Sequence, residues 1–177
     1  PVATLSEEIA EITVTCIAPS KTFNLAGLST SSVIISNPVL RKYFRSKVEH
    51  LHIEHGNIFG TTASTAAYSF GEEWLGQLLD NLKGKAGYAV EFCRENIPEI
   101  IPSTPEATYM IWLDCRKLGL NSEGLRDFFV RKAKVGLNEG ISFGPGGEGF
   151  MRMNLATARD VVKRAFDQIE RAVAEYR

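Results

Sequence analysis

A long helical pattern constrains the fold of this chain more than any other sequence feature. Apolar residues recur at helical spacing from Glu72 to about Asn96. They are Trp74, Leu75, Leu78, Leu79, Leu82, Ala86, Ala89 and Phe92. Gly84 and Gly87 interrupt this pattern, and because glycine weakens a helix interior, they predict a bend.

A proline-rich segment follows the helical pattern directly. Three prolines lie between residues 97 and 105, where they end the helix and mark a boundary. A helix of this length commonly joins two parts of a protein. We therefore expect residues 71–97 to connect residues 1–70 with residues 98–177.

Strand-like and helical segments alternate before the long helix. Residues 12–17 are rich in β-branched side chains and predict a buried strand, and residues 31–36 predict a second strand. Asn37 followed by Pro38 is typical of a helix start. Small residues fill the segment from Gly60 to Ser69, which indicates a closely packed helix.

The same alternation continues after the prolines. Residues 109–113, 135–137 and 150–155 predict strands. Ser122 is expected to cap one helix, and Thr157 to open a C-terminal one. Alternating strands and helices predict an α/β fold.

Composition excludes several classes of function. The 177 residues hold 20 Lys and Arg against 21 Asp and Glu, a net charge of −1, so no basic field would gather nucleic acid or an anionic membrane. No apolar run reaches the roughly 18 residues of a membrane-spanning helix, and we expect no signal peptide. Three cysteines, far apart in the sequence, predict reduced thiols in a cytoplasmic protein.

Lys21 is the first candidate for chemistry, since it follows the predicted strand of residues 12–17 and has apolar sequence on both sides. Burial lowers the pKa of an amine, and a neutral amine can form a Schiff base with a carbonyl group. An ordinary solvated loop lysine is the alternative. The serine that β-lactamase-like enzymes place three residues before their lysine is replaced by Ala18.

Arg152 is the second candidate, and it follows a glycine-rich run at residues 144–149. That run leads into a strand and lacks the lysine of a phosphate-binding Walker loop, so a flexible or tight turn is expected. Arg152 lies between two methionines, and its forked guanidinium suits a carboxylate. The alternative is an arginine on a solvent-facing strand.

Histidines at positions 50, 52 and 55 form a third cluster. Imidazole is a common zinc ligand, but this cluster ends a predicted amphipathic helix, where basic residues are frequent. No cysteine or further histidine lies nearby in the sequence. We therefore expect no metal site.

Two of these segments resemble a known enzyme family. The run Pro-Ser-Lys-Thr-Phe-Asn-Leu-Ala-Gly-Leu at residues 19–28 closely resembles the cofactor-binding lysine segment of fold-type I pyridoxal-phosphate enzymes. Residues 138–156, with Phe-Gly-Pro-Gly-Gly-Glu-Gly-Phe-Met-Arg-Met-Asn-Leu-Ala at their end, resemble the carboxylate-binding segment of the same family. The nearest branch is the bacterial cystathionine β-lyases, or cysteine-S-conjugate β-lyases, which are related to class I and II aminotransferases. The resemblance covers essentially this whole chain but only the C-terminal part of the family.

The resemblance implies both an architecture and a site. Residues 1–70 would be the remnant of the large cofactor-binding domain, and residues 98–177 the small C-terminal α/β domain of an aminotransferase-like fold. Lys21 would hold pyridoxal 5'-phosphate and act as the catalytic base, Ser20 would contribute to cofactor binding, and Arg152 would bind the carboxylate of a small amino-acid substrate. The intact enzyme is expected to be a homodimer.

The reaction implied is cleavage of a carbon–sulfur bond at Cβ, which yields a thiol, pyruvate and ammonia. An aminotransferase on the same scaffold is the first alternative. A non-catalytic domain is the alternative for this chain in isolation, because Ala18 and Ser29 stand where the family often has a serine and a basic residue that contact the phosphate. We expect the isolated chain to bind the cofactor weakly and to be inactive.

Overall fold

The computed structural model describes residues 1–54 and 56–176. The chain forms two compact units, Pro1–Gln77 and Leu78–Arg177. Their boundary lies inside helix α5 (Glu72–Asn96), so the last part of this helix belongs to the core of the second unit.

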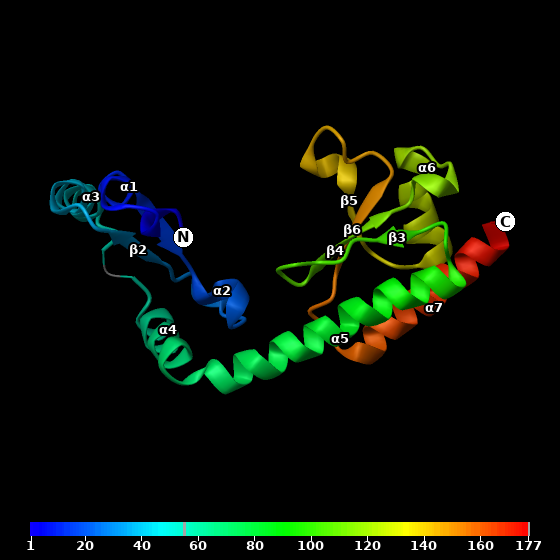
Figure 1. Ribbon diagram of the computed structural model, residues 1–177, viewed down its shortest axis with the longest axis horizontal. Coiled ribbons are helices and arrows are strands. Elements are labelled where there is room, and N and C mark those ends of the chain that lie inside the picture. The colour runs from blue at the N-terminus through cyan, green and yellow to red at the C-terminus, as the bar shows by residue number, and fades with distance from the viewer. Residues whose placement is uncertain (55, 177) are drawn as a thin grey trace. The chain divides into compact units, whose positions relative to one another are not determined.

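Helix α5 spans the residues that its apolar spacing predicted. It continues without interruption through Gly84 and Gly87, and Figure 1 draws α5 as one straight helix, so the predicted bend is wrong. A Cβ atom at either glycine would meet open space, which means that no close neighbour requires a glycine at these positions.

The first unit contains a two-stranded antiparallel sheet. Strand β1 (Val14–Ile17) pairs with β2 (Ser32–Ile35), which confirms both predicted strands. The predicted burial of the first strand is wrong, because Val14 and Ile17 are 43% and 40% exposed. Strand β1 has a single neighbour, and Ile35 on β2 is the buried residue of this sheet.

Local capping and close packing explain the helices of the first unit. The α-helices of this unit are α1 (Glu7–Glu11), α2 (Pro19–Thr22), α3 (Pro38–His50) and α4 (Ile58–Phe70). As predicted, α3 begins after Asn37, whose side-chain oxygen accepts hydrogen bonds from the backbone N–H groups of Val39 at 2.9 Å and Leu40 at 3.1 Å. A Cβ atom at Gly60 would collide with the Thr30 hydroxyl, so α4 packs closely at this residue. The rest of α4 is exposed or half-buried, and the close packing predicted for the whole small-residue helix is therefore wrong.

The second unit is built on a four-stranded antiparallel sheet. Its strands, in spatial order, are β3 (Ile101–Pro102), β4 (Met110–Asp114), β6 (Phe150–Asn154) and β5 (Asn138–Glu139). Helices α5 and α7 (Arg159–Tyr176) run side by side and pack together through Tyr88, Phe92 and Phe166 (Figure 1). Helices and sheets thus combine into the α/β fold that the sequence predicted.

Alternate residues of the two central strands face the helices. Ile111 and Leu113 on β4, with Met151 and Met153 on β6, are buried in the core. Because successive strand side chains point to opposite faces, the residues between them lie on the other face of the sheet. That second face carries the candidate site.

Helix α6 (Ser122–Asp127) follows β4 and differs from the prediction at its start. The capping residue is Asn121, not Ser122, and its side-chain oxygen accepts a hydrogen bond of 2.8 Å from the backbone N–H of Gly124. Asparagine and serine are both favoured caps, and here the first of the two adjacent candidates is used. The chain then continues as a π-helix over Phe128–Ala133.

The strand predicted at residues 135–137 is wrong, since the structure has β5 at Asn138–Glu139 instead. Lys134 adopts the left-handed conformation, with φ 56°, and ends the π-helix. The backbone N–H of Val135 then donates to the carbonyl of Phe129 at 2.9 Å. These residues therefore close the helix and do not pair with the sheet.

The C-terminal helix also begins later than predicted. Helix α7 starts at Arg159 rather than at Thr157, and the carbonyl of Ala158 accepts the backbone N–H groups of Val161 and Val162. None of the helices in the described part of the chain is long and apolar enough to cross a bilayer.

Candidate functional site

Lys21 lies on α2, the single helical turn that follows β1. Pro19 occupies the first turn of this helix and is almost fully buried, so it fixes the turn to the first unit. The Lys21 side chain is exposed and makes no hydrogen bond or ion pair with the residues that the structure describes. The predicted partial burial of Lys21 is therefore wrong for this unit, because a one-turn helix on a two-stranded sheet covers little surface.

The segment after Lys21 is held by an aromatic contact. Phe23 lies 5.6 Å from the ring of Tyr68 and 6.0 Å from that of Trp74, measured between ring centroids. Gly71 leaves room for this ring, since a Cβ there would lie 2.7 Å from Phe23. Pro19 on one side and Phe23 on the other thus anchor the short turn that carries Lys21.

Ser20 is half-buried and takes part in the same turn. Its carbonyl accepts a hydrogen bond of 3.0 Å from the backbone N–H of Leu25. Asn24, just before, adopts the left-handed conformation with φ 56°, which lets the chain turn back towards α2. The Ser20 hydroxyl makes no hydrogen bond with a described residue.

Arg152 lies on the sheet face that α5 and α7 leave uncovered. It stands on β6 opposite Trp112 on β4 and opposite Asn138 on β5. Its Nη2 donates to the side-chain oxygen of Asn138 at 3.0 Å, and its guanidinium carbon lies 4.3 Å from the centre of the Phe143 ring. The alternative of an arginine on a solvent-facing strand does not hold, because Arg152 is half-buried among these three residues.

A glycine-rich turn carries Phe143 over this face. The turn begins with a short 3-10 helix at residues 140–143, and the backbones of Gly140 and Gly147 approach so closely that a Cβ on either would collide with the other. The ring of Phe143 meets that of Trp112 edge to face, with centroids 5.3 Å apart. Trp112, Phe143 and Phe150 line a cavity of about 380 Å³ with the glycines of the turn. The predicted tight turn is confirmed, and it shapes the surroundings of Arg152.

The charge of Arg152 has no counter-ion among the described residues. Its Nε is buried without an acceptor, and Nη1 makes no hydrogen bond with them. Arg116 on the same face provides a contrast, since it lies 4.9 Å over the Phe150 ring and pairs with Asp114 at 2.7 Å. Hydrogen bonds from Arg116 hold the pKa of the Asp114 carboxyl below its usual value. Unlike Arg116, Arg152 thus has donors free for an anion and no carboxylate partner among the described residues.

Lys85 is a residue of this unit that the sequence analysis did not single out. It is 5% exposed and donates from Nζ to the carbonyl of Leu155 at 3.2 Å and of Thr157 at 2.6 Å. Burial lowers the pKa of its amine. It shares the buried stripe of α5 with Leu82 and Ala89, and this spacing was the signal that could have identified it. Lys85 fixes the connection from the Arg152 strand to α7.

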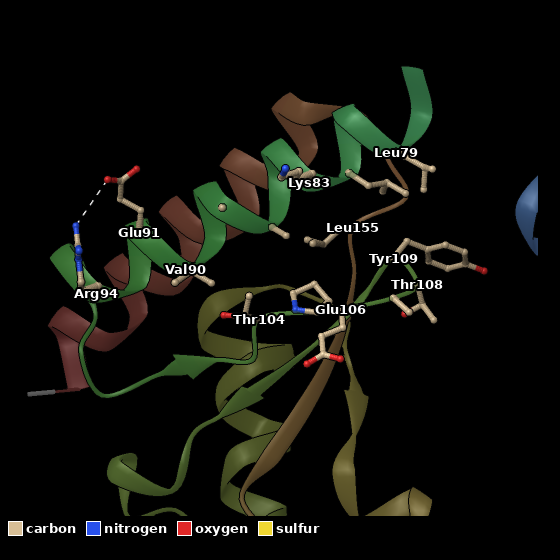
Figure 2. Close-up of a pocket in the computed structure, with 15 residues that line it drawn as sticks. Leu79, Lys83, Val90, Glu91, Arg94, Thr104, Glu106, Thr108, Tyr109 and Leu155 are labelled. Carbon is tan, nitrogen blue, oxygen red and sulfur yellow. Dashed lines mark ion pairs between the residues drawn. The ribbon is translucent and has the colours of Figure 1, made fainter. Parts of the chain in front are cut away.

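A cavity of about 750 Å³ lies between α5 and the loop before β4. Figure 2 shows Leu79, Val90 and Leu155 around it, with the Glu91–Arg94 ion pair at its rim. Neither Arg152 nor the glycine-rich turn lines this cavity. It is therefore separate from the carboxylate-binding candidate.

The histidine cluster forms no ligand set in the described residues. His50 and His52 are exposed, and residues 1–54 and 56–176 contain no group of three or more His, Cys, Asp or Glu side chains placed to hold a metal. The third histidine of the cluster, at position 55, lies outside the described residues.

Comparison with known proteins identifies the fold. No protein-family model matches the chain. Cystathionine beta-lyase PatB of Bacillus subtilis (strain 168) is 41% identical over 168 residues, which is 93% of this chain and 43% of that protein. The chain spans less than half the length of the curated relatives it matches.

Solved structures agree with this similarity. Cystalysin from Treponema denticola, which contains pyridoxal 5'-phosphate, matches with a TM-score of 0.92 and 31% identity over 98% of this chain and 44% of that one. The PLP-bound C-S lyase from Staphylococcus hominis matches with a TM-score of 0.79 and 30% identity over 92% of this chain and 42% of that one. The chain therefore has the α/β fold of the C-terminal portion of fold-type I, aminotransferase-like enzymes, which confirms the predicted resemblance and fold class.

Proposed function

We propose that this chain, which has the sequence and fold of the C-terminal portion of fold-type I pyridoxal-phosphate enzymes, forms part of a carbon–sulfur β-lyase. The substrate would be cystathionine or another cysteine conjugate, and the products a thiol, pyruvate and ammonia. Similarity to a cystathionine beta-lyase over 93% of the chain supports this reaction. The observation that supports an amino acid as the substrate is the half-buried guanidinium of Arg152, which has no counter-ion among the described residues.

The residues of the first unit fit pyridoxal 5'-phosphate. The amine of Lys21 is exposed and unpaired among described residues, as an amine that bonds to an aldehyde must be. The Ser20 hydroxyl, one residue before, has no hydrogen-bond partner among them and would donate to the phosphate. Lys21 would hold the cofactor covalently. The bound cofactor would supply an electron sink for the carbanion formed at the substrate's Cα.

The chain's own groups would perform two tasks. Lys21 Nζ, when uncharged and released, would accept the proton from the substrate's Cα as a general base. Arg152 would pair with the α-carboxylate and hold the Cα–H bond in one orientation. The Cβ–S bond would then break with its electron pair leaving on sulfur.

The organisation of the complete enzyme is part of the proposal. Residues 1–70 would complete the large cofactor-binding domain, residues 71–97 would be the interdomain helix and residues 98–177 the small domain. A homodimer acting on a small amino acid in the cytoplasm is the proposed form, without a role for nucleic acid or membrane. Three cysteines without disulfides support a reducing compartment.

An assay of the complete gene product with cystathionine and added cofactor tests the reaction. We expect pyruvate to be released without any keto acid. If the amino group moved only when a keto acid was supplied, the protein would be an aminotransferase. If neither reaction occurred in a protein that bound the cofactor, the lyase proposal would be wrong.

A further inference from the structure

The guanidinium of Arg152 is restrained on one face and at one corner by two side chains. Phe143 covers the face, with its ring centre 4.3 Å from the guanidinium carbon. Asn138 accepts a hydrogen bond from Nη2 at 3.0 Å. Trp112 supports Phe143 from the side, with ring centroids 5.3 Å apart. Arg152 therefore occupies a defined plane although it lacks an ionic partner among the described residues.

These restraints leave one edge of the guanidinium for a ligand. Nε is buried, so an incoming carboxylate cannot reach it without rearrangement. Nη1 makes no hydrogen bond with the described residues, and Nη2 uses Asn138 for one of its two N–H groups. A carboxylate would thus bind end-on, across Nη1 and the second N–H of Nη2.

We propose that Asn138 and Phe143 are positioning residues that orient Arg152 for end-on binding of the substrate carboxylate. This inference rests on the proposed function of Arg152. The neutral amide of Asn138 holds Nη2 without competing for the positive charge, whereas a carboxylate at this position would form an ion pair and occupy the guanidinium. Phe143 keeps the guanidinium plane fixed through the attraction between its ring face and the cation.

Variants at position 138 separate orientation from simple loss of structure. In Asn138→Ala the hydrogen bond is lost, and we expect the dissociation constant of the amino acid to rise about ten-fold, since a hydrogen bond to a charged group is being removed. In Asn138→Asp the folded shape is preserved, but the new carboxylate competes directly with the substrate. We expect Asn138→Asp to lose more affinity for the amino acid than Asn138→Ala, on the order of 100-fold. Phe143→Leu should raise the dissociation constant of the amino acid about three-fold.

The matched control is Asn154→Ala. Asn154 lies two residues from Arg152 on the same strand, and its side-chain oxygen accepts from the backbone N–H of Ala156 at 2.7 Å. No hydrogen bond joins it to Arg152, whose side-chain partner among the described residues is Asn138. We expect a change of less than about two-fold in amino-acid affinity, because orientation of the guanidinium is untouched.

The experiment measures binding in the complete, cofactor-loaded gene product by the absorbance change of the cofactor. An analogue of an S-substituted cysteine with a methylene group in place of the sulfur, which cannot lose a thiolate, is compared with the matching amine that lacks the carboxylate. Affinity for the amino acid should fall in the order wild type, Asn138→Ala, Asn138→Asp, while affinity for the amine stays constant. The NMR signal of Arg152 Nε–H, recorded without cofactor, should shift and broaden in Asn138→Ala as the side chain gains freedom.

Two different failures can be told apart. The positioning role would be overturned if Asn138→Ala and Asn138→Asp lost equal affinity for the amino acid and the amine. It would also be overturned if neither variant lost affinity for the amino acid. Both results would leave the proposed function intact. If Arg152→Lys also left the preference for the amino acid over the amine unchanged, Arg152 would not be the carboxylate anchor. That second result would overturn the proposed function of Arg152 itself.

Discussion

The guanidinium carbon of Arg152 lies 4.3 Å from the centre of the Phe143 ring, and the two residues come from different structural elements. Arg152 is on β6, whereas Phe143 closes the 3-10 helix that opens the glycine-rich turn. The turn delivers an aromatic ring to the arginine, and in the proposed function it would contribute to recognition in this way.

Arg152→Lys should impair the complete enzyme strongly on amino-acid substrates. Lysine keeps the charge but offers a point charge in place of a planar pair of donors. We expect kcat/KM to fall roughly 30- to 1000-fold, which corresponds to about 2–4 kcal/mol. Arg116→Lys is the matched control, since Arg116 already pairs with Asp114 at 2.7 Å. Near-normal kcat/KM in Arg152→Lys would place the carboxylate anchor elsewhere.

Two glycine substitutions should change stability in opposite directions. Gly140→Ala forces a Cβ into the backbone of Gly147 and of Phe150, and overpacking of this kind costs about 1–3 kcal/mol. Gly84→Ala adds a methyl group in open space on α5 and should stabilise the protein by about 0.5–1 kcal/mol. Urea unfolding measures both. An unchanged free energy of unfolding in Gly140→Ala would show that the turn can open without loss of stability.

Lys85→Met should change how stability depends on pH. Burial lowers the pKa of folded Lys85 below its usual value of 10.5, so the unfolded chain binds more protons in the interval between the two values. The Lys85 contribution to the free energy of unfolding therefore rises with pH through this interval. We expect the free energy of unfolding of the wild type, minus that of Lys85→Met, to rise as the pH approaches 10.5. Parallel pH profiles for the two proteins would contradict this assignment.

Thiol labelling should distinguish the three cysteines. Cys16 is exposed, whereas Cys93 and Cys115 are buried. Burial raises the pKa of Cys93 to about 12 and also raises that of Cys115, so neither forms the reactive thiolate at pH 9. We expect an aromatic disulfide reagent to modify Cys16 alone in the folded protein at pH 7 and at pH 9. Rapid modification of Cys93 at pH 9 would mean that the α5 packing opens readily.

Local sequence patterns predicted the secondary-structure elements that depend mainly on residues close together in the sequence. The α5 helix followed from its apolar spacing, and the start of α3 from Asn37 and Pro38. The burial of β1 was predicted wrongly because a run of β-branched residues reports strand propensity and says little about what covers the strand. The cap of α6 was shifted by one residue, since Asn121 and Ser122 are both favourable.

The candidate site was predicted only in part for a similar reason. Arg152 stood out because its forked guanidinium in an apolar strand suits a carboxylate, Lys21 because it follows a predicted strand, and the family resemblance pointed to both. Asn138 lies 14 residues from Arg152 in the sequence and meets it only through the pairing of β5 with β6. Lys85 reaches the carbonyl of Leu155, 70 residues away. Such contacts depend on strand register and helix docking, which no local pattern contains.

The attachment point of the cofactor is the central claim, and one measurement tests it most directly. The complete gene product is mixed with pyridoxal 5'-phosphate, reduced with borohydride and digested, and the modified peptide is identified by mass spectrometry. We expect one phosphopyridoxyl group, on Lys21, and its loss in Lys21→Ala but not in Lys83→Ala, a lysine of α5 in the other unit. A stoichiometric label on another lysine, or no label in the folded protein, would contradict the account.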